Sequence, residues 1–137
     1  MDNYKEAFLA YMDEKGIKYQ DLDERAVRLS FHSDVVPQGV DIVVIFDKEN
    51  HHGVHFLSNG FCIVPENKFG AVLMACNEAN ATYRWAKFYV SDKMSVCVED
   101  DAILDFSNVG AECAEIAFRL SDIIDEVYPS LMKAIYS

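Results

Sequence analysis

The segment Val40-Asp41-Ile42-Val43-Val44-Ile45-Phe46-Asp47 decides the fold, because it is a nearly unbroken run of β-branched residues. A run of this kind predicts a strand that is covered on both faces. Before it, residues 25–32 alternate apolar and polar side chains, which predicts a half-buried strand. After it, residues 53–64 predict a third strand, and Asn59-Gly60 favours a turn or bulge at which this strand can break.

Helical periodicity begins on either side of these strands. Residues 3–15 carry apolar side chains at helical spacing, with Asp2 or Asn3 as the N-cap and Gly16 as the end. Pro65-Glu66 opens a second helix, because proline suits the first helical turn. The expected buried stripe of this helix consists of Phe69, Val72, Leu73 and Cys76.

The rest of the chain predicts a hairpin and a long helix. Residues 84–90 and 94–99 form the strands of the hairpin. Ser107 or Asn108 begins the helix, and Pro129 near its end should kink it or start a new short turn. The helix has more apolar positions than one sheet face needs, so we expect the surplus to pack on the amino-terminal helix or on a second subunit.

The predicted order is therefore α-β-β-β-α-β-β-α in a single domain that spans residues 1–137. Strands joined by hairpins, with helices gathered together, indicate an α+β two-layer sandwich. We expect a five-stranded, largely antiparallel sheet with the helices on one face.

The charge of the chain excludes several kinds of partner. The formal net charge is -11 at pH 7, because 12 basic residues are scattered among 23 acidic ones. Nucleic acids and anionic membranes attract clustered basic residues and would repel this chain. With no signal peptide or membrane span in the sequence, we expect a cytoplasmic protein. Its four cysteines, Cys62, Cys76, Cys97 and Cys113, lie among apolar residues and are expected to be reduced core thiols.

A family resemblance is carried by the second half of the chain. It begins at Asn77-Glu78-Ala79-Asn80, continues through residues 83–90 and 96–99, and ends with the long helix and its residues 125–131. These segments resemble the YbjN family, whose fold is similar to that of the type III secretion (Tir) chaperones. The resemblance implies a small bacterial protein, described as a regulator of sensory transduction, with no established enzymatic activity. The similar chaperones are acidic homodimers that bind an unfolded segment of a client protein.

Three histidines raise the alternative of a small metal-binding protein. His51, His52 and His55 follow Asp47 and Glu49, and imidazole and carboxylate are ligands of zinc, nickel or copper. On an extended segment, however, His51 and His55 lie ~13 Å apart at ~3.3 Å per residue, too far to share an ion. Only a tight turn at Gly53 could gather them, so we expect solvated histidines of a hairpin loop and no cofactor.

Catalytic motifs are weak. Glu99-Asp100-Asp101 and Asp105 lack the spacing of a calcium loop, and we expect them to end a strand and solvate a connection, although Asp101 could attract a basic partner. No nucleophile motif or phosphate-binding loop is present. We therefore predict no catalytic residue and rank an enzyme as the last alternative.

The aromatic residues are the candidate protein-binding surface. If Ala86 and Phe88 point into the core, Trp85 and Tyr89 stand on the outer face of the same strand. Tryptophan and tyrosine dominate binding hot spots, although these two could equally pack under a terminal helix. Phe118 is a third candidate, on the long helix. The leading hypothesis is a non-enzymatic, acidic protein-binding module, chaperone-like or regulatory, that forms a homodimer and binds a protein client or regulatory partner.

Overall fold

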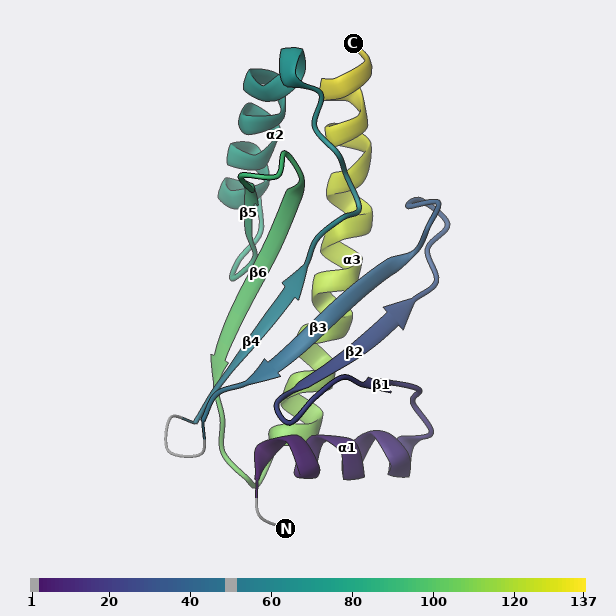
Figure 1. The fold of residues 1–137 in the computed structure, drawn as a ribbon, viewed down its shortest axis with the longest axis vertical. Helices are drawn as coiled ribbons and strands as arrows, with labels where there is room; N and C mark the ends of the chain where they lie inside the picture. Colours follow the sequence, from purple (N-terminus) through teal and green to yellow (C-terminus); the bar gives the residue numbers. More distant parts are fainter. Residues whose placement is uncertain (1–2, 49–51) are drawn as a thin grey trace.

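The computed structural model describes residues 3–48 and 52–137, which form three α-helices and a six-stranded sheet (Figure 1). The elements are, in chain order, α1 (Tyr4–Lys15), β1 (Gln20–Asp21), β2 (Ala26–Phe31), β3 (Val40–Phe46), β4 (Gly53–Ser58), η1 (Glu66–Lys68), α2 (Phe69–Thr82), β5 (Lys87–Val90), β6 (Val96–Ile103) and α3 (Val109–Tyr136). The α+β class is confirmed. Of these helices, none has the length and apolar content that crossing a membrane requires.

The sheet has the strand order β1-β2-β3-β4-β6-β5, and every neighbouring pair is antiparallel. The prediction of five strands was wrong, because β1 adds a sixth. Its two residues are polar and too few to show any alternation, so their periodicity carries no signal. Pairing of Gln20 with Arg28 and Asp21 with Val27 makes the strand.

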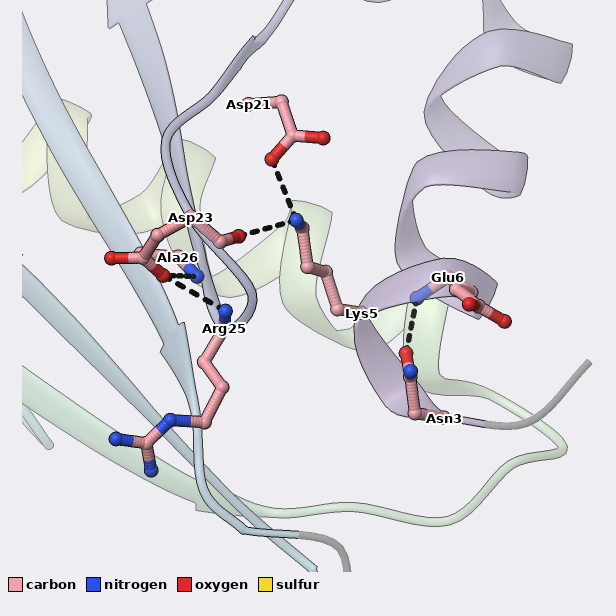
Figure 2. Close-up of polar contacts among 7 residues, drawn as sticks. All are labelled: Asn3, Lys5, Glu6, Asp21, Asp23, Arg25 and Ala26. Carbon is pink, nitrogen blue, oxygen red and sulfur yellow. Dashed lines mark hydrogen bonds and ion pairs between the residues drawn. The ribbon is translucent and has the colours of Figure 1, made fainter.

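Polar contacts with α1 hold β1 in place (Figure 2). Lys5 donates from Nζ to a carboxylate oxygen of Asp21 at 2.6 Å and to the carbonyl oxygen of Asp23 at 2.5 Å. The Asp23 carboxylate in turn accepts from the amides of Arg25 and Ala26, at 2.8 and 2.9 Å. The start of α1 is fixed as predicted, since the Asn3 side chain accepts from the amide of Glu6 at 2.8 Å.

One face of the sheet carries the core. Along β3, Val40, Ile42, Val44 and Phe46 are buried, whereas Asp41 is exposed and Val43 and Ile45 are only half-buried. The prediction that this strand is covered on both faces was therefore wrong. In the view of Figure 1, α3 lies behind the strands. Phe8 of α1 contacts Phe46, which belongs to the buried set of β3. We call the opposite side the open face; it carries Val43, Ile45, His55, Leu57, Tyr89 and Glu99.

The long helix α3 lies along the sheet and carries most of its apolar positions into the core. Leu120, Ile124 and Leu131 are fully buried, and α1 and α2 both pack against the helix. The amino-terminal helix therefore covers part of the surplus, as expected, whereas Phe118 stays 41% exposed. Pro129 lies inside the helix, which runs unbroken to Tyr136. Of the two expectations for Pro129, a kink or a new short turn, the new turn was wrong. Burial of Val127 and Leu131 on either side of the proline offsets the ~3 kcal/mol that an interior proline costs.

The buried stripe of α2 also differs from the prediction. It consists of Val72, Ala75, Cys76 and Ala79. Phe69 and Leu73 are each 40% exposed, because small alanines face the neighbouring elements in their place.

Candidate protein-binding site

Trp85 lies in the connection between α2 and β5, and its side chain is 66% exposed. Its φ is 69°, in the left-handed region that bulky residues rarely adopt. The amide of Ala86 donates to the carbonyl of Arg84 at 2.8 Å, which closes a three-residue turn around Trp85. A γ-turn with positive φ is rare and strained, and such strain is concentrated at functional sites. The backbone thus presents a large aromatic side chain to solvent at an energetic cost.

Beside Trp85 is a hollow of about 340 Å³ between the second half of β6 and α3. We call it the Trp85 pocket. Its apolar lining comes from Ala102 of β6 and from three side chains of α3, namely Ile116, Leu120 and Ile123. Charged residues of both signs surround this lining. The pocket therefore combines an apolar wall, an aromatic rim and charged groups, as binding sites for side chains do.

Arg119 of α3 places a positive group over the indole. Its guanidinium carbon lies 5.7 Å from the centroid of the Trp85 ring, within the range of a cation–π contact. Its Nε donates to Glu115 one helical turn earlier, at 2.7 Å. The charge of Arg119 is thus already paired, and its guanidinium lies over the indole at the rim of the pocket.

Asp100 supplies an acidic group on the inner side of the pocket. Asp100 of β6 is the register partner of Phe56 on the neighbouring strand β4, and the side chain of Phe56 is fully buried. Because register partners point to the same face of a sheet, Asp100 points to the helix-covered face. Burial raises the pKa of the half-buried Asp100 carboxyl to about 6. The hydrogen bond from the Asp101 amide lowers this pKa, the Asp101 carboxylate raises it, and the charge of His55 lowers it. Among the described residues, no lysine or arginine forms an ion pair with Asp100.

The open face carries a second polar group, built around His55. Its Nε2 lies 2.9 Å from Glu99 and its Nδ1 lies 2.8 Å from Asp101. Tyr89 bonds to Glu99, and this bond, with burial, raises the pKa of the tyrosine. A histidine donates from both ring nitrogens only as the imidazolium cation. Both ring nitrogens of His55 therefore lie against carboxylates, and neither is free to act as a base or a ligand.

The three aromatic candidates do not form one surface. The strand β5 begins at Lys87, so the alternation that was expected to align Trp85 with Tyr89 stops short of Trp85. Trp85 turns to α3, whereas Tyr89 lies on the open face with Glu99. Phe118, which is 41% exposed, contacts Phe31 of β2 edge to face. The three aromatic side chains thus contact different parts of the structure.

The histidines of the metal hypothesis are also separated. His51 lies outside the described residues. His52 Nδ1 lies 2.6 Å from the hydroxyl of Tyr4 on α1, and His55 is part of β4 rather than of a loop. Within residues 3–48 and 52–137, no three His, Cys, Asp or Glu side chains are arranged to hold a metal ion.

The sequence analysis placed Glu99-Asp100-Asp101 at the end of a strand, and it did not identify Asp100 as a residue of the pocket. Strand β6 continues to Ile103 instead of ending at Glu99, because it pairs with β4 as far as Gly53. Glu99 and Asp101 then face His55, and Asp100 faces the helices. A signal was present, since Val96, Val98 and Asp100 share one phase of the strand alternation. Asp105 does lie in a connection, where it accepts from the amide of Ser107 at 2.8 Å.

The four cysteines are free and buried, as predicted. Burial, with a contribution from Cys76, raises the pKa of Cys62 to about 11. Burial also raises the pKa of Cys113 to about 12, with a contribution from Glu112. A thiol with a raised pKa is a poor nucleophile, because the thiolate is the reactive form.

A larger hollow of about 1190 Å³ lies between α1 and the start of the sheet. Two of its lining residues, Asn3 and Lys48, adjoin residues 1–2 and 49–51. The Trp85 pocket instead has an exposed tryptophan at its rim, and we therefore treat it as the candidate site.

Taken together, fold and site define an α+β protein with one helix-covered sheet face and an exposed tryptophan beside a charged pocket. A family model with the description "YbjN: Putative bacterial sensory transduction regulator" matches residues 5–127. The chain belongs to the YbjN family, and the match extends the resemblance to the first half of the sequence.

Two solved structures are similar over almost the whole chain. The crystal structure of YbjN from E. coli has a TM-score of 0.65 and 13% identity, and the match covers 91% of each chain. A chain of the heterodimeric ExoU–SpcU complex from the type III secretion system of Pseudomonas aeruginosa has a TM-score of 0.55 and 14% identity. That match covers 93% of this chain and 96% of the other. At these identities the likeness establishes the fold alone. The search of curated proteins found no relative of similar sequence.

Proposed function

We propose that this chain is a non-enzymatic protein-binding module, chaperone-like or regulatory, and that Trp85 is its principal contact residue. The observation that carries the proposal is the 66% exposed indole of Trp85 on a strained turn. Tryptophan is enriched at the centre of protein interfaces, where it fills pockets and excludes water. The family description and the likeness to a chain of a secretion-system complex support a role in regulation or protein binding.

Catalysis is less well supported by the same residues. The buried thiols have raised pKa values, and both nitrogens of His55 already lie against carboxylates. The Trp85 pocket contains acids and arginines but no serine, threonine, cysteine or histidine among its lining residues. Binding therefore accounts for the pocket better than nucleophilic chemistry does.

Capture of partners from the cytosol of the source organism tests the proposal. The variant is Trp85→Gly, because glycine adopts the positive φ of this turn without strain and the variant should fold. The matched control is Tyr136→Ala, which removes another exposed aromatic residue, at the far end of α3. We expect a partner that wild type and Tyr136→Ala retain and Trp85→Gly loses. Retention of the same proteins by all three would refute the role of Trp85.

A second copy of the chain is a further candidate partner, favoured by the open face. Val43, Ile45 and Leu57 are only half-buried there. In a dimer with two-fold symmetry, these side chains of both copies would be covered by the same interface. We propose a homodimer through this face. Sedimentation at micromolar concentration should show a dimer that Ile45→Asp converts to a folded monomer; a wild-type monomer would rule it out.

A further inference from the structure

The Trp85 pocket has a feature that the proposed function does not use: a half-buried carboxylate on its inner side that forms no ion pair with a lysine or arginine of the described residues. Asp100 receives a hydrogen bond from the amide of Asp101 at 2.8 Å. Both arginines of the pocket are engaged elsewhere or exposed: Arg119 bonds to Glu115, and Arg84 lies in the solvent-exposed turn. A carboxylate that gives up hydration without forming an ion pair is destabilised, and an incoming cation would relieve this.

We propose that the Trp85 pocket binds a long aliphatic side chain that ends in a cation, a lysine or arginine of a partner polypeptide. This inference rests on the proposed function, whose partner chemistry it specifies. The apolar stem would pack on Ala102, Ile116 and Leu120, and the cationic end would reach Asp100. Trp85 closes the rim, where its ring already accepts one guanidinium at 5.7 Å. A basic partner also fits the net charge of -11 of the chain.

Shape and charge together select this class of ligand. An anion would meet Asp100, Glu112 and Glu115 in the lining. A purely apolar side chain would bury Asp100 further without pairing it, which costs free energy. A lysine or arginine satisfies both the apolar wall and the carboxylate, because these side chains carry an aliphatic stem below their charge.

Trp85 is the only tryptophan of the chain, so its fluorescence reports on the pocket directly. The probes are blocked heptapeptides of glycine and serine with lysine, arginine or norleucine at the centre, titrated to millimolar concentration at constant ionic strength. We expect a saturable change in Trp85 fluorescence with the lysine or arginine peptide and little change with norleucine. Spermidine is a separate arm: if it binds while neither cationic peptide does, the ligand is a free polyamine and the proposal is wrong.

Asp100→Asn should weaken binding of the cationic peptide at least about tenfold, because a charge-assisted hydrogen bond is lost. Its matched control is Asp122→Asn, which makes the same change in net charge at an exposed position of α3 outside the pocket lining. Binding in wild type should also strengthen as the pH rises from 5 to 7, since Asp100 then ionises.

Three outcomes would overturn the proposal. One is the absence of a saturable response to either cationic peptide. Another is an equal loss in Asp100→Asn and Asp122→Asn, which would indicate general charge attraction. The third is equal binding of norleucine and lysine. If any of these occurs while the Trp85→Gly variant still loses a captured partner, the proposed function stands and the assignment of a cationic ligand fails; if capture is also unchanged, both fail.

Discussion

The edge of the sheet at β5 depends on a single side chain of α2. Asn80 donates from Nδ2 to the carbonyl of Phe88 at 3.0 Å, and the amide of Phe88 donates to Asn80 Oδ1 at 2.6 Å. The amide group thus pairs with both outward backbone groups of Phe88, as a neighbouring strand would. An edge strand with free backbone groups is a template for unwanted pairing, and here a helix side chain covers it. We predict that Asn80→Ala destabilises the fold and opens this edge.

The size of the effect follows from the two hydrogen bonds. Each contributes ~0.5–1.5 kcal/mol net, so their loss should lower the free energy of unfolding by ~1–3 kcal/mol. Alanine is a better helix former than asparagine by up to ~0.7 kcal/mol, which partly offsets the loss. Asn77→Ala, at an exposed position three residues earlier in α2, measures this offset alone. The difference between the two variants should therefore be about 2 kcal/mol.

Urea unfolding of both variants, with thermal unfolding alongside, measures this difference. For a chain of this length, 2 kcal/mol corresponds to a fall in Tm of about 7 °C. Asn80→Asp is an informative third variant, because it keeps the acceptor for the Phe88 amide and places a carboxylate against the Phe88 carbonyl. Sedimentation should show more self-association of Asn80→Ala than of Asn77→Ala. If Asn80→Ala is as stable as Asn77→Ala and no more prone to associate, the edge-covering role of Asn80 is refuted.

Three further predictions concern the core and the pocket. Gly110→Ala should lower the free energy of unfolding by ~1–3 kcal/mol, because the added methyl group would collide with the side chain of Tyr11. Gly70→Ala, where the methyl group meets open space, should raise it by up to ~1 kcal/mol. Urea unfolding compares the two variants. A thiol reagent at pH 8 should label the native cysteines slowly, since burial raises the pKa of Cys113 to about 12, and rapid labelling of three or four would contradict this. Because the pKa of Asp100 is raised to about 6, the folded state binds more protons than the unfolded state between pH 4 and 6, and the contribution of this residue to stability falls as the pH rises through that window. Asp100→Asn should therefore be more stable than wild type at pH 7 and lose this advantage at pH 4. A difference in stability that does not depend on pH would refute the assignment.

The sequence predicted those elements whose periodicity is long and regular. The helix at residues 3–15, the strands around Val40–Phe46 and the long carboxyl-terminal helix were confirmed within a few residues. Errors arose where a tertiary contact overrides local pattern. The two residues of β1 become a strand through pairing with β2 and contacts from Lys5. Strand β6 gains its last residues from pairing with β4, although Glu99-Asp100-Asp101 has the composition of a loop.

The apolar run of β3 shows a different kind of error. It predicted a strand covered on both faces, and the structure covers one. The hydrophobic character of Val43 and Ile45 was read correctly, but what covers a side chain depends on elements that a single segment cannot specify. Half-buried aliphatic side chains on an otherwise polar face are the reason that a second copy of the chain is the natural occupant to test there.

Trp85 shows how one backbone angle changes the nature of a site. Extended alternation from β5 would have placed Trp85 beside Tyr89 on the open face, as the sequence predicted. With φ at 69°, the chain reverses at Trp85, and the indole lies against Arg119 of α3 instead. A flat aromatic stripe is thereby replaced by a rim next to a half-buried carboxylate. In the proposed interaction, a partner side chain that packs beside Trp85 also meets Asp100, so its chemistry is constrained as well as its shape.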